Sequence, residues 1–388
     1  MKNFLWNKLL DQLEAKIDLE DQCLVYNDLV DGYYLRESAY AAVVFATQYK
    51  ITKLRRYEDI AVKLIERLLE KSTELEIGKM PEPYWNPRGT TWKVGSLPSS
   101  ILTWKALTEA NKLMDGRFEL KHLDYSLNEL ISSSSVGVGS FAHDAVPSHS
   151  RKNRTPKVLN TSAMVCYVKS VQGMSNKDII NFLQSSIRSD GCFTYFSVGF
   201  SQHIFYEALE FIGGRPREYY IKLLRDRSVY FGDFIHHLGV MDFLLCSVQN
   251  SGTNEDKILN LVLRAYEFVK QQLKYTDGII SLNFTWEPEL TFIRYCNFRD
   301  SSCYFVLLSV LAQLRKLDLI TDEEFSKMEF GLLGYIENKL INFDVANISI
   351  DSYDANLEEI NKILPRASEN IVDKMYHYSR YLSYRSEI

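Results

Sequence analysis

Apolar and amphipathic helical runs alternate along most of this chain, and this alternation limits the folds open to it. Twelve runs with helical periodicity fall into six consecutive pairs. The first member of a pair is apolar on nearly all sides, as in SAYAAVVFATQY, whereas the second carries charges along one face, as in RRYEDIAVKLIERLLEKS. A helix that is apolar all round is buried, and a helix with one polar face borders solvent. The sequence therefore predicts an inner ring of helices inside an outer ring.

The predicted fold class is all-α, an (α/α)6 toroid of six inner/outer helical hairpins with a C-terminal helical extension. The alternative is an irregular helical bundle or solenoid. We expect residues 1–350 to form a single toroid domain and residues 351–388 to form a helical tail that packs on it or docks from it. The six predicted pairs are 38–50 with 55–72, 97–113 with 121–131, 159–172 with 176–188, 201–213 with 216–229, 234–250 with 254–275, and 300–315 with 321–340.

A short turn motif recurs between these runs. Asp-Gly occurs four times, and an aromatic residue or Ile follows each copy within two residues. Glycine can take the left-handed conformation that ends a helix. The motif therefore indicates a structural repeat and gives Asp190-Gly191 a role in a turn. The copies are Asp31-Gly32, Asp115-Gly116, Asp190-Gly191 and Asp277-Gly278.

Charge and composition exclude several classes of protein. The 388 residues carry a formal net charge of -5, and Lys and Arg are scattered, so we expect no nucleic-acid partner. No apolar run reaches the length of a membrane span without a charge, and the N-terminus does not resemble a signal peptide. The six Cys include no C-x-x-C pair and several lie in apolar runs, which is typical of free thiols. These features predict a cytoplasmic protein.

The inner helices of a toroid begin around a funnel, so polar residues at those starts are candidates for a ligand site. A carboxyl group buried there would have a raised pKa suited to acid–base chemistry, and imidazole titrates near neutral pH. Trp rings suit sugar faces, and Arg suits an anionic group. A structural ion pair or a hydrogen-bonded core His is the alternative for each charged candidate. The catalytic candidates are Glu207, His203, Tyr206, Glu37 and His236, and the substrate-binding candidates are Arg36, Trp85, Trp92, Asn160, Arg294, Arg299 and Asp300.

Three stretches resemble inner-helix entries of the terpenoid-cyclase and protein-prenyltransferase toroid superfamily. They are DGCFTYF followed by FSQHIFYEALEFI, then FIRYCNFRDSSCYFVLLSVLAQL, and VLNTSAMVCYVKSV. The likeness covers residues 85–315 and is closest to bacterial members associated with polysaccharide biosynthesis. The resemblance implies a toroid that binds or acts on a carbohydrate in its central funnel, in surface-polysaccharide synthesis, by carboxylate and His acid–base chemistry if it is catalytic.

Two alternatives stay open. The first is isoprenoid or prenyl-transfer chemistry in the same cavity, for which Asp190, Cys192 and His236 offer the ligand types of a zinc site. The Asp-x-Asp-Asp and Asp-Asp-x-x-Asp motifs of terpene enzymes are absent, and we expect no metal and no cofactor. The second is a non-catalytic scaffold whose Tyr-rich tail, DKMYHYSRYLSYRSEI, docks on a protein partner.

Overall fold

The computed structural model describes most of the chain and places it in two concentric rings of helices. The described residues are 2–20, 22–27, 32–74, 84–85, 97–143, 157–194, 234–250, 254–282, 298–337, 350–352 and 371–387. The predicted pair 201–213 and 216–229 lies outside them.

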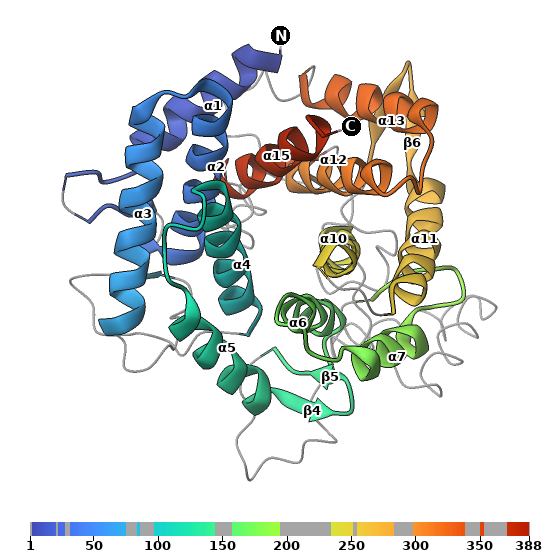
Figure 1. The fold of residues 1–388 in the computed structure, drawn as a ribbon. Coiled ribbons are helices and arrows are strands. Elements are labelled where there is room, and N and C mark those ends of the chain that lie inside the picture. Colours follow the sequence, from blue (N-terminus) through green and yellow to red (C-terminus); the bar gives the residue numbers. More distant parts are fainter. Residues whose placement is uncertain are drawn as a thin grey trace.

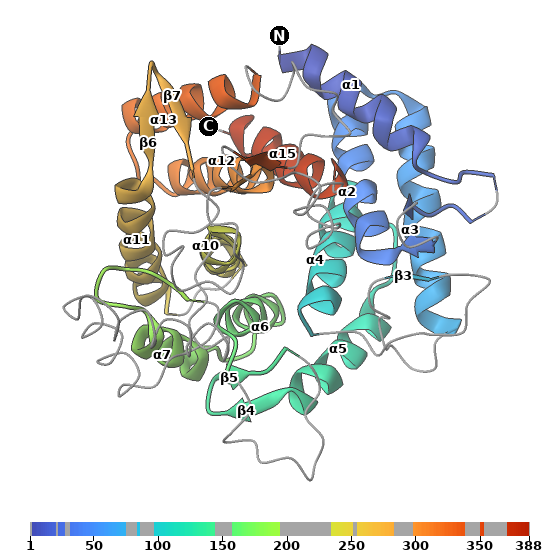
Figure 2. The same ribbon diagram turned by 180° about the vertical axis from the view of Figure 1, so that it is seen from behind.

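Six helices of the described chain form the inner ring, seen along its axis in Figure 1 and from behind in Figure 2. Each helix contacts its two neighbours in the order given below, and the last returns to contact the first. The inner helices are α2 (Leu35–Thr52), α4 (Leu97–Leu113), α6 (Leu159–Val171), α10 (Phe234–Asn250), α12 (Ser301–Lys316) and α15 (Ile371–Arg385).

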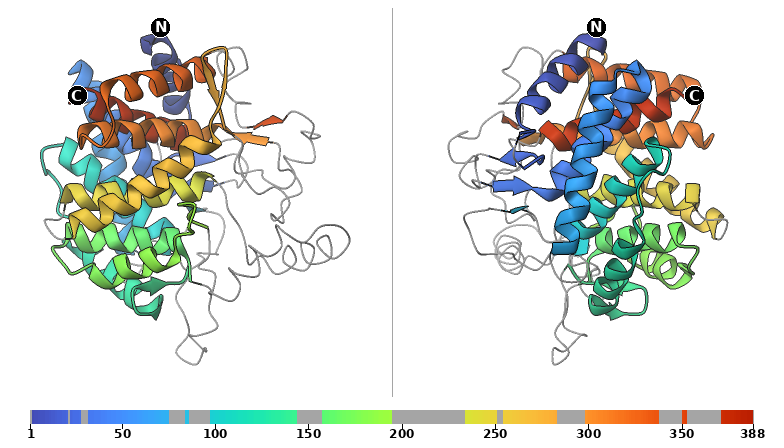
Figure 3. Two further views of the ribbon diagram at one scale, coloured as in Figure 1. Left: turned by 90° about the vertical axis from the view of Figure 1, so that its right-hand side faces the viewer. Right: turned by 60° about the vertical axis from the view of Figure 1, so that its left-hand side comes forward.

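An outer helix packs against each inner helix, and the side views in Figure 3 show the two layers. The outer helices are amphipathic: in α11 the buried residues Ile258, Leu261, Val262 and Ala265 follow helical spacing and face inward. In the order of their inner partners the outer helices are α3 (Arg55–Glu74), α5 (Lys121–Ser133), α7 (Lys177–Ser186), α11 (Glu255–Gln272), α13 (Asp322–Tyr335) and α1 (Lys2–Ala15). The predicted toroid is confirmed.

The sixth position of the toroid is built from the two ends of the described chain. Helix α15, expected as an extension, is an inner helix that contacts α12 and α2, and α1 lies outside it. Its side chains Met375, Tyr376, Tyr378 and Tyr381 are each at most 1% exposed. The expected tail outside the ring is therefore wrong for this helix: its Tyr and Arg side chains bond to Lys105, Glu109 and Asp242 inside the ring.

Short strands lie mainly beside the inner-helix starts. Strand β2 (Gly32–Tyr34) directly precedes α2 and pairs with β1 (Tyr26–Asn27) and β3 (Tyr84–Trp85), whereas β8 (Phe298–Asp300) directly precedes α12 and pairs with β9 (Ile350–Ser352). All these pairs are antiparallel. Two further antiparallel pairs are β4 (Ser135–Gly137) with β5 (Ser140–Phe141) and β6 (Lys274–Thr276) with β7 (Ile279–Ser281).

The Asp-Gly turns are structural where the chain is described. Gly116, Gly191 and Gly278 have φ angles of +74°, +93° and +77°, the left-handed region that favours glycine. Asp190 caps its own turn, because its Oδ1 accepts a hydrogen bond from the Cys192 backbone N at 2.9 Å. The Asp190-Gly191 turn brings the chain against α11, where a Cβ on Gly191 would lie 2.2 Å from the carbonyl oxygen of Arg264.

Replacing Gly191 by Ala is expected to lower the free energy of unfolding by about 3 kcal/mol or more, because backbone would have to move. Gly116→Ala is the matched control, since a Cβ there meets no atom within 4 Å. The Gly116→Ala variant should lose only about 1 kcal/mol of unfolding free energy, the cost of placing a non-glycine residue in the left-handed region. Urea unfolding of both variants checks this, and equal losses would contradict the packing argument.

No helix in the described part of the chain is long and apolar enough to cross a membrane.

Candidate functional site

A cavity of about 280 Å³ lies inside the inner ring, and all six inner helices contribute to its wall. The contributing residues occupy the first three turns of their helices, so the cavity lies toward the inner-helix starts. Leu102, Met164, Phe243 and Val306 supply apolar surface. The titratable and charged residues in the wall are Arg36, Lys105, His143, His236, Asp242, Asp373 and His377.

Of the three His side chains in the cavity wall, one comes from helix α10 and one from helix α15. On α10, His237 is fully buried: its Nδ1 accepts from the Phe193 N at 3.1 Å and its Nε2 lies 3.1 Å from the Ala265 carbonyl oxygen. His236, one position earlier, instead lines the cavity. On α15, the cavity residue is His377. The structural and the cavity-facing His are therefore adjacent in the sequence.

His377 is held neutral by its surroundings. Burial lowers its pKa to about 3; the carboxylate of Asp242 opposes this, and the cations Arg380 and Lys105 reinforce it. Its Nδ1 has no hydrogen-bond partner within the described residues, and its Nε2 lies 3.9 Å from Oδ1 of Asp373. A neutral imidazole in a cavity wall can accept or donate a proton during a reaction.

This low pKa predicts a pH dependence of stability. The unfolded chain protonates His377 below its ordinary pKa of about 6.5, whereas the folded chain does so only near pH 3. Stability linked to His377 is therefore present at pH 7 and is lost as the pH falls, by about 2 kcal/mol at pH 5. A His377→Asn variant should lose correspondingly less stability than the wild type between pH 7 and pH 5 in chemical unfolding. Parallel curves for the two proteins would contradict the assignment.

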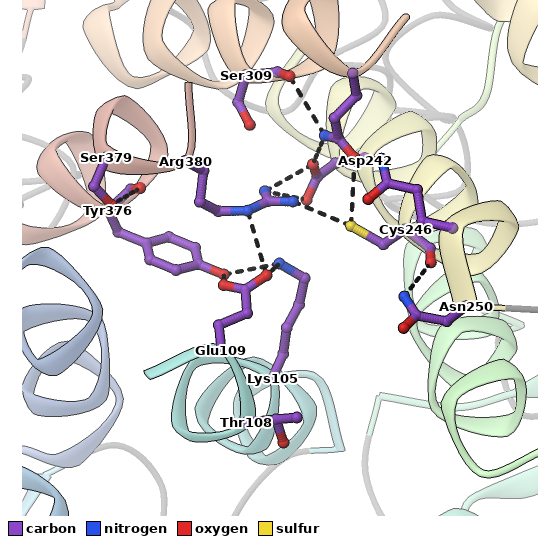
Figure 4. Close-up of polar contacts among 12 residues, drawn as sticks. Lys105, Thr108, Glu109, Asp242, Cys246, Asn250, Ser309, Tyr376, Ser379 and Arg380 are labelled. Atoms are coloured by element: carbon purple, nitrogen blue, oxygen red, sulfur yellow. Dashed lines mark hydrogen bonds and ion pairs between the residues drawn. The ribbon is translucent and has the colours of Figure 1, made fainter. Parts of the chain in front are cut away.

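The floor of the cavity is an ion cluster between helices α4, α10, α12 and α15, drawn in Figure 4. On one side, Lys105 Nζ donates to Glu109 Oε1 at 2.6 Å and to the Tyr376 hydroxyl at 2.8 Å. The Tyr376 hydroxyl in turn donates to Glu109 Oε2 at 2.7 Å. Burial raises the pKa of Glu109, but the charges of Lys105 and Arg380 outweigh it and hold that pKa below its ordinary value.

On the other side of the floor, the guanidinium group of Arg380 donates hydrogen bonds to both carboxylate oxygens of Asp242, at 2.7 and 2.8 Å. Gln313 donates to Asp242 Oδ1 at 2.6 Å, and a second Arg380 nitrogen donates to the Cys246 sulfur at 3.1 Å. Burial raises the pKa of Asp242, yet Arg380 and Lys105 overcome this and hold it well below its usual range. Burial and the Asp242 charge raise the pKa of Cys246 to about 11, which keeps it a thiol.

The structure brings three of the predicted site residues together. Arg36, Asn160 and His236 all line the cavity. Asn160 also begins helix α6, where its Oδ1 accepts from the Thr161 N at 2.8 Å. Glu37, 6% exposed on α2, is not part of the cavity wall.

The other predicted residues cannot be placed at the cavity. Trp85 lies in β3 opposite Tyr33, and Arg299 and Asp300 lie in β8, but only their backbone is described. The candidates Glu207, His203, Tyr206, Trp92 and Arg294 lie outside the described residues.

Sequence reasoning missed Lys105, Asp242, Tyr376 and His377. Asp242 did carry a usable signal, since it is the lone charge in the apolar run GVMDFLLCSV. A lone buried charge needs a partner of opposite charge. The partner of Asp242 is Arg380, which lies in the segment expected as a C-terminal tail.

A zinc site at Asp190, Cys192 and His236 is not supported. Cys192 is fully buried at the turn, whereas His236 faces the cavity. Within the described residues no three His, Cys, Asp or Glu side chains are grouped so as to hold a metal ion.

Comparison with known proteins identifies the fold. No protein-family model matches the sequence, and no curated protein sequence does. Among solved structures, a sugar epimerase from a ruminal bacterium is similar with a TM-score of 0.66 at 10% identity, over 99% of each chain. D-mannose isomerase has a TM-score of 0.62 at 14% identity, over 99% of this chain and 98% of that one. An unsaturated glucuronyl hydrolase specific for heparin has a TM-score of 0.61 at 10% identity, over 98% of this chain and 96% of that one.

Proposed function

We propose that this protein acts on a sugar, and that it catalyses epimerisation or aldose–ketose isomerisation by moving a proton at a carbon next to the sugar carbonyl. The observation that carries the proposal is the pair of imidazoles, His236 from α10 and His377 from α15, in the wall of one cavity. Such a reaction needs two groups that exchange protons with the substrate and needs no oxidant.

The proposal gives both imidazoles the role of exchanging protons with the sugar. Burial lowers the pKa of His377 to about 3, so its ring is neutral at pH 7 and has an electron pair to accept a proton. So low a pKa makes the ring a weak base, and the bound sugar has to stabilise its protonated form for the reaction to proceed. His236 is the second exchanging group in the proposal. Arg36 and Asn160 supply donors for sugar hydroxyl groups in the same wall.

Glycoside hydrolysis is less well supported by the described residues. Most glycosidases use two carboxyl groups, one of which starts protonated. In this cavity wall the carboxylates are Asp242 and Asp373. Asp242 has both oxygens bonded to Arg380 and a pKa below its ordinary value, so it cannot serve as the acid.

The cavity wall also favours a sugar over a prenyl chain. Isoprenoid chemistry uses an apolar, aromatic-lined cavity. This wall does have aromatic and aliphatic side chains, but it also contains Arg, Lys, Asp and three His, which suit a polar ligand. The sugar epimerase and D-mannose isomerase among the structural neighbours support the same choice. An epimerase or isomerase supplies a sugar that polysaccharide synthesis can consume, which keeps the expected role in surface-polysaccharide synthesis within the proposal.

The test is exchange of a carbon-bound proton with solvent. The wild-type protein is incubated in D₂O with a panel of free aldoses, ketoses and disaccharides, and NMR follows deuterium entering the carbon next to the carbonyl. We expect deuterium in both substrate and product for at least one sugar. A His122→Gln variant serves as a control, because this exposed His lies on outer helix α5. Release of sugar from an oligosaccharide without any exchange would point to hydrolysis and overturn the proposal.

A further inference from the structure

We propose that Lys105 is a catalytic residue of this site: its ammonium group donates a hydrogen bond to the sugar oxygen that becomes negative during the reaction. The inference rests on the proposed function and adds to it a group that neither imidazole can replace. Lys105 lies on α4, in the cavity floor drawn in Figure 4.

The ammonium group has a donor to spare. Lys105 is 1% exposed and still borders the cavity. Its Nζ directs two protons to Glu109 and Tyr376, at 2.6 and 2.8 Å. An ammonium group carries three protons, and the described residues accept two of them, so one is left for a ligand.

The position of the ammonium group is fixed before any ligand binds. Its Nζ lies 5.8, 5.7 and 5.3 Å from the ring centroids of Tyr167, Phe243 and Tyr376. Ring faces at this distance attract a cation, and the hydrogen bond to Glu109 also holds the ammonium group in place. A charge held in place in this way stabilises a developing anion without reorganisation during the reaction.

A purely structural role explains this lysine poorly. Buried ion clusters are weak stabilisers, and well-packed apolar side chains often replace them at no cost. The surrounding rings of Tyr167 and Phe243 already provide apolar packing at this depth. Glu109 cannot take over a role in the cavity, because its two oxygens are bonded to Lys105 and Tyr376.

The proposed step balances without a cofactor. An imidazole takes the proton from the carbon next to the carbonyl, and the C–H electron pair forms a double bond to the carbonyl carbon. The carbonyl π pair moves to its oxygen, and the resulting enediolate oxygen accepts the Lys105 hydrogen bond. Return of a proton to the other face of the same carbon gives the epimer. For the isomer, the proton goes to the former carbonyl carbon, the hydroxyl on the neighbouring carbon gives up its proton to become the new carbonyl, and the former carbonyl oxygen gains a proton to become a hydroxyl.

The experiment compares Lys105→Met with Glu109→Gln, using the sugar that exchanges deuterium with the wild type. Both variants break the same ion pair, but only Lys105→Met removes the ammonium group from the cavity floor, and Arg380 stays in both. We expect Lys105→Met to lower kcat and the exchange rate together by about 10²–10³-fold, with KM changed by less than about threefold. The fold-loss of activity in Glu109→Gln should be at least about tenfold smaller than the fold-loss in Lys105→Met.

The outcomes separate the two proposals. Absence of exchange in the wild type removes the proposed function. If the wild type does exchange deuterium, two results would overturn the role of Lys105 and leave the proposed function standing. One is a Lys105→Met rate within about threefold of the wild-type rate, and the other is an equal loss of activity in Glu109→Gln. If thermal unfolding shows that Lys105→Met does not fold, the comparison uses Lys105→Gln, which keeps two N–H donors for Glu109 and loses the charge.

Discussion

Replacement of Arg380 by Met is expected to lower the free energy of unfolding by about 3–5 kcal/mol, because it leaves the buried carboxylate of Asp242 without the guanidinium group that pairs with it. Asp242 and Arg380 are 3% and 4% exposed, and both oxygens of Asp242 bond to the guanidinium group. Among the described residues, Gln313 would be its remaining hydrogen-bond partner, and Lys105 would be the remaining cation that lowers its pKa. Urea unfolding, with the slope m compared between the proteins, measures the loss.

Two further variants test the reason for this loss. The double variant Asp242→Asn with Arg380→Met removes both charges and should recover much of the stability, as a double-mutant cycle will show. Arg385→Met is the control on the same helix: its ion pair with Glu329 spans 2.9 Å, but the Arg385 side chain is 41% exposed. That pair should contribute about 1 kcal/mol or less. A double variant no more stable than Arg380→Met would show that the charge of Asp242 is not the cause.

A His377→Asn variant is expected to lose about 10²–10⁴-fold in kcat/KM for the sugar that the wild type converts, because one of the two proton-exchanging groups is removed. Its thermal unfolding at pH 7 should stay close to that of the wild type, since His377 Nδ1 has no bond to lose within the described residues. Steady-state kinetics and deuterium exchange measure the effect. His122→Gln should keep full activity, and a His377→Asn variant that also does so would rule out a role in proton transfer.

The toroid could be predicted because burial acts on each helix separately. The run SAYAAVVFATQY had to be buried, and the charged face of RRYEDIAVKLIERLLEKS had to border solvent, whatever their neighbours were. The sixth position was not predictable in this way. Tyr376 and Arg380 look like surface residues in the sequence, and only the partners Lys105, Glu109 and Asp242 make them internal.

The same limit applies to the site. Arg36, Asn160 and His236, which line the cavity, could be named as candidates because each stands at the start of an apolar run, where the inner helices open. Lys105 and His377 stand at no such boundary. The bond from Lys105 to Tyr376 joins positions 271 residues apart, and no local pattern in the sequence indicates a contact of that separation.

The closing of the ring by α15 has a consequence for how the proposed activity would be lost on heating. This helix packs on α12 and α2, and it carries Tyr376, His377 and Arg380 together. Proteins open in cooperative local units, some at a lower free energy than global unfolding. Detachment of α15 as one such unit would dismantle the cavity while the other five inner helices stayed folded. Inactivation should then precede the loss of helical circular dichroism, and amide exchange in α2 and α12 should quicken along with that in α15.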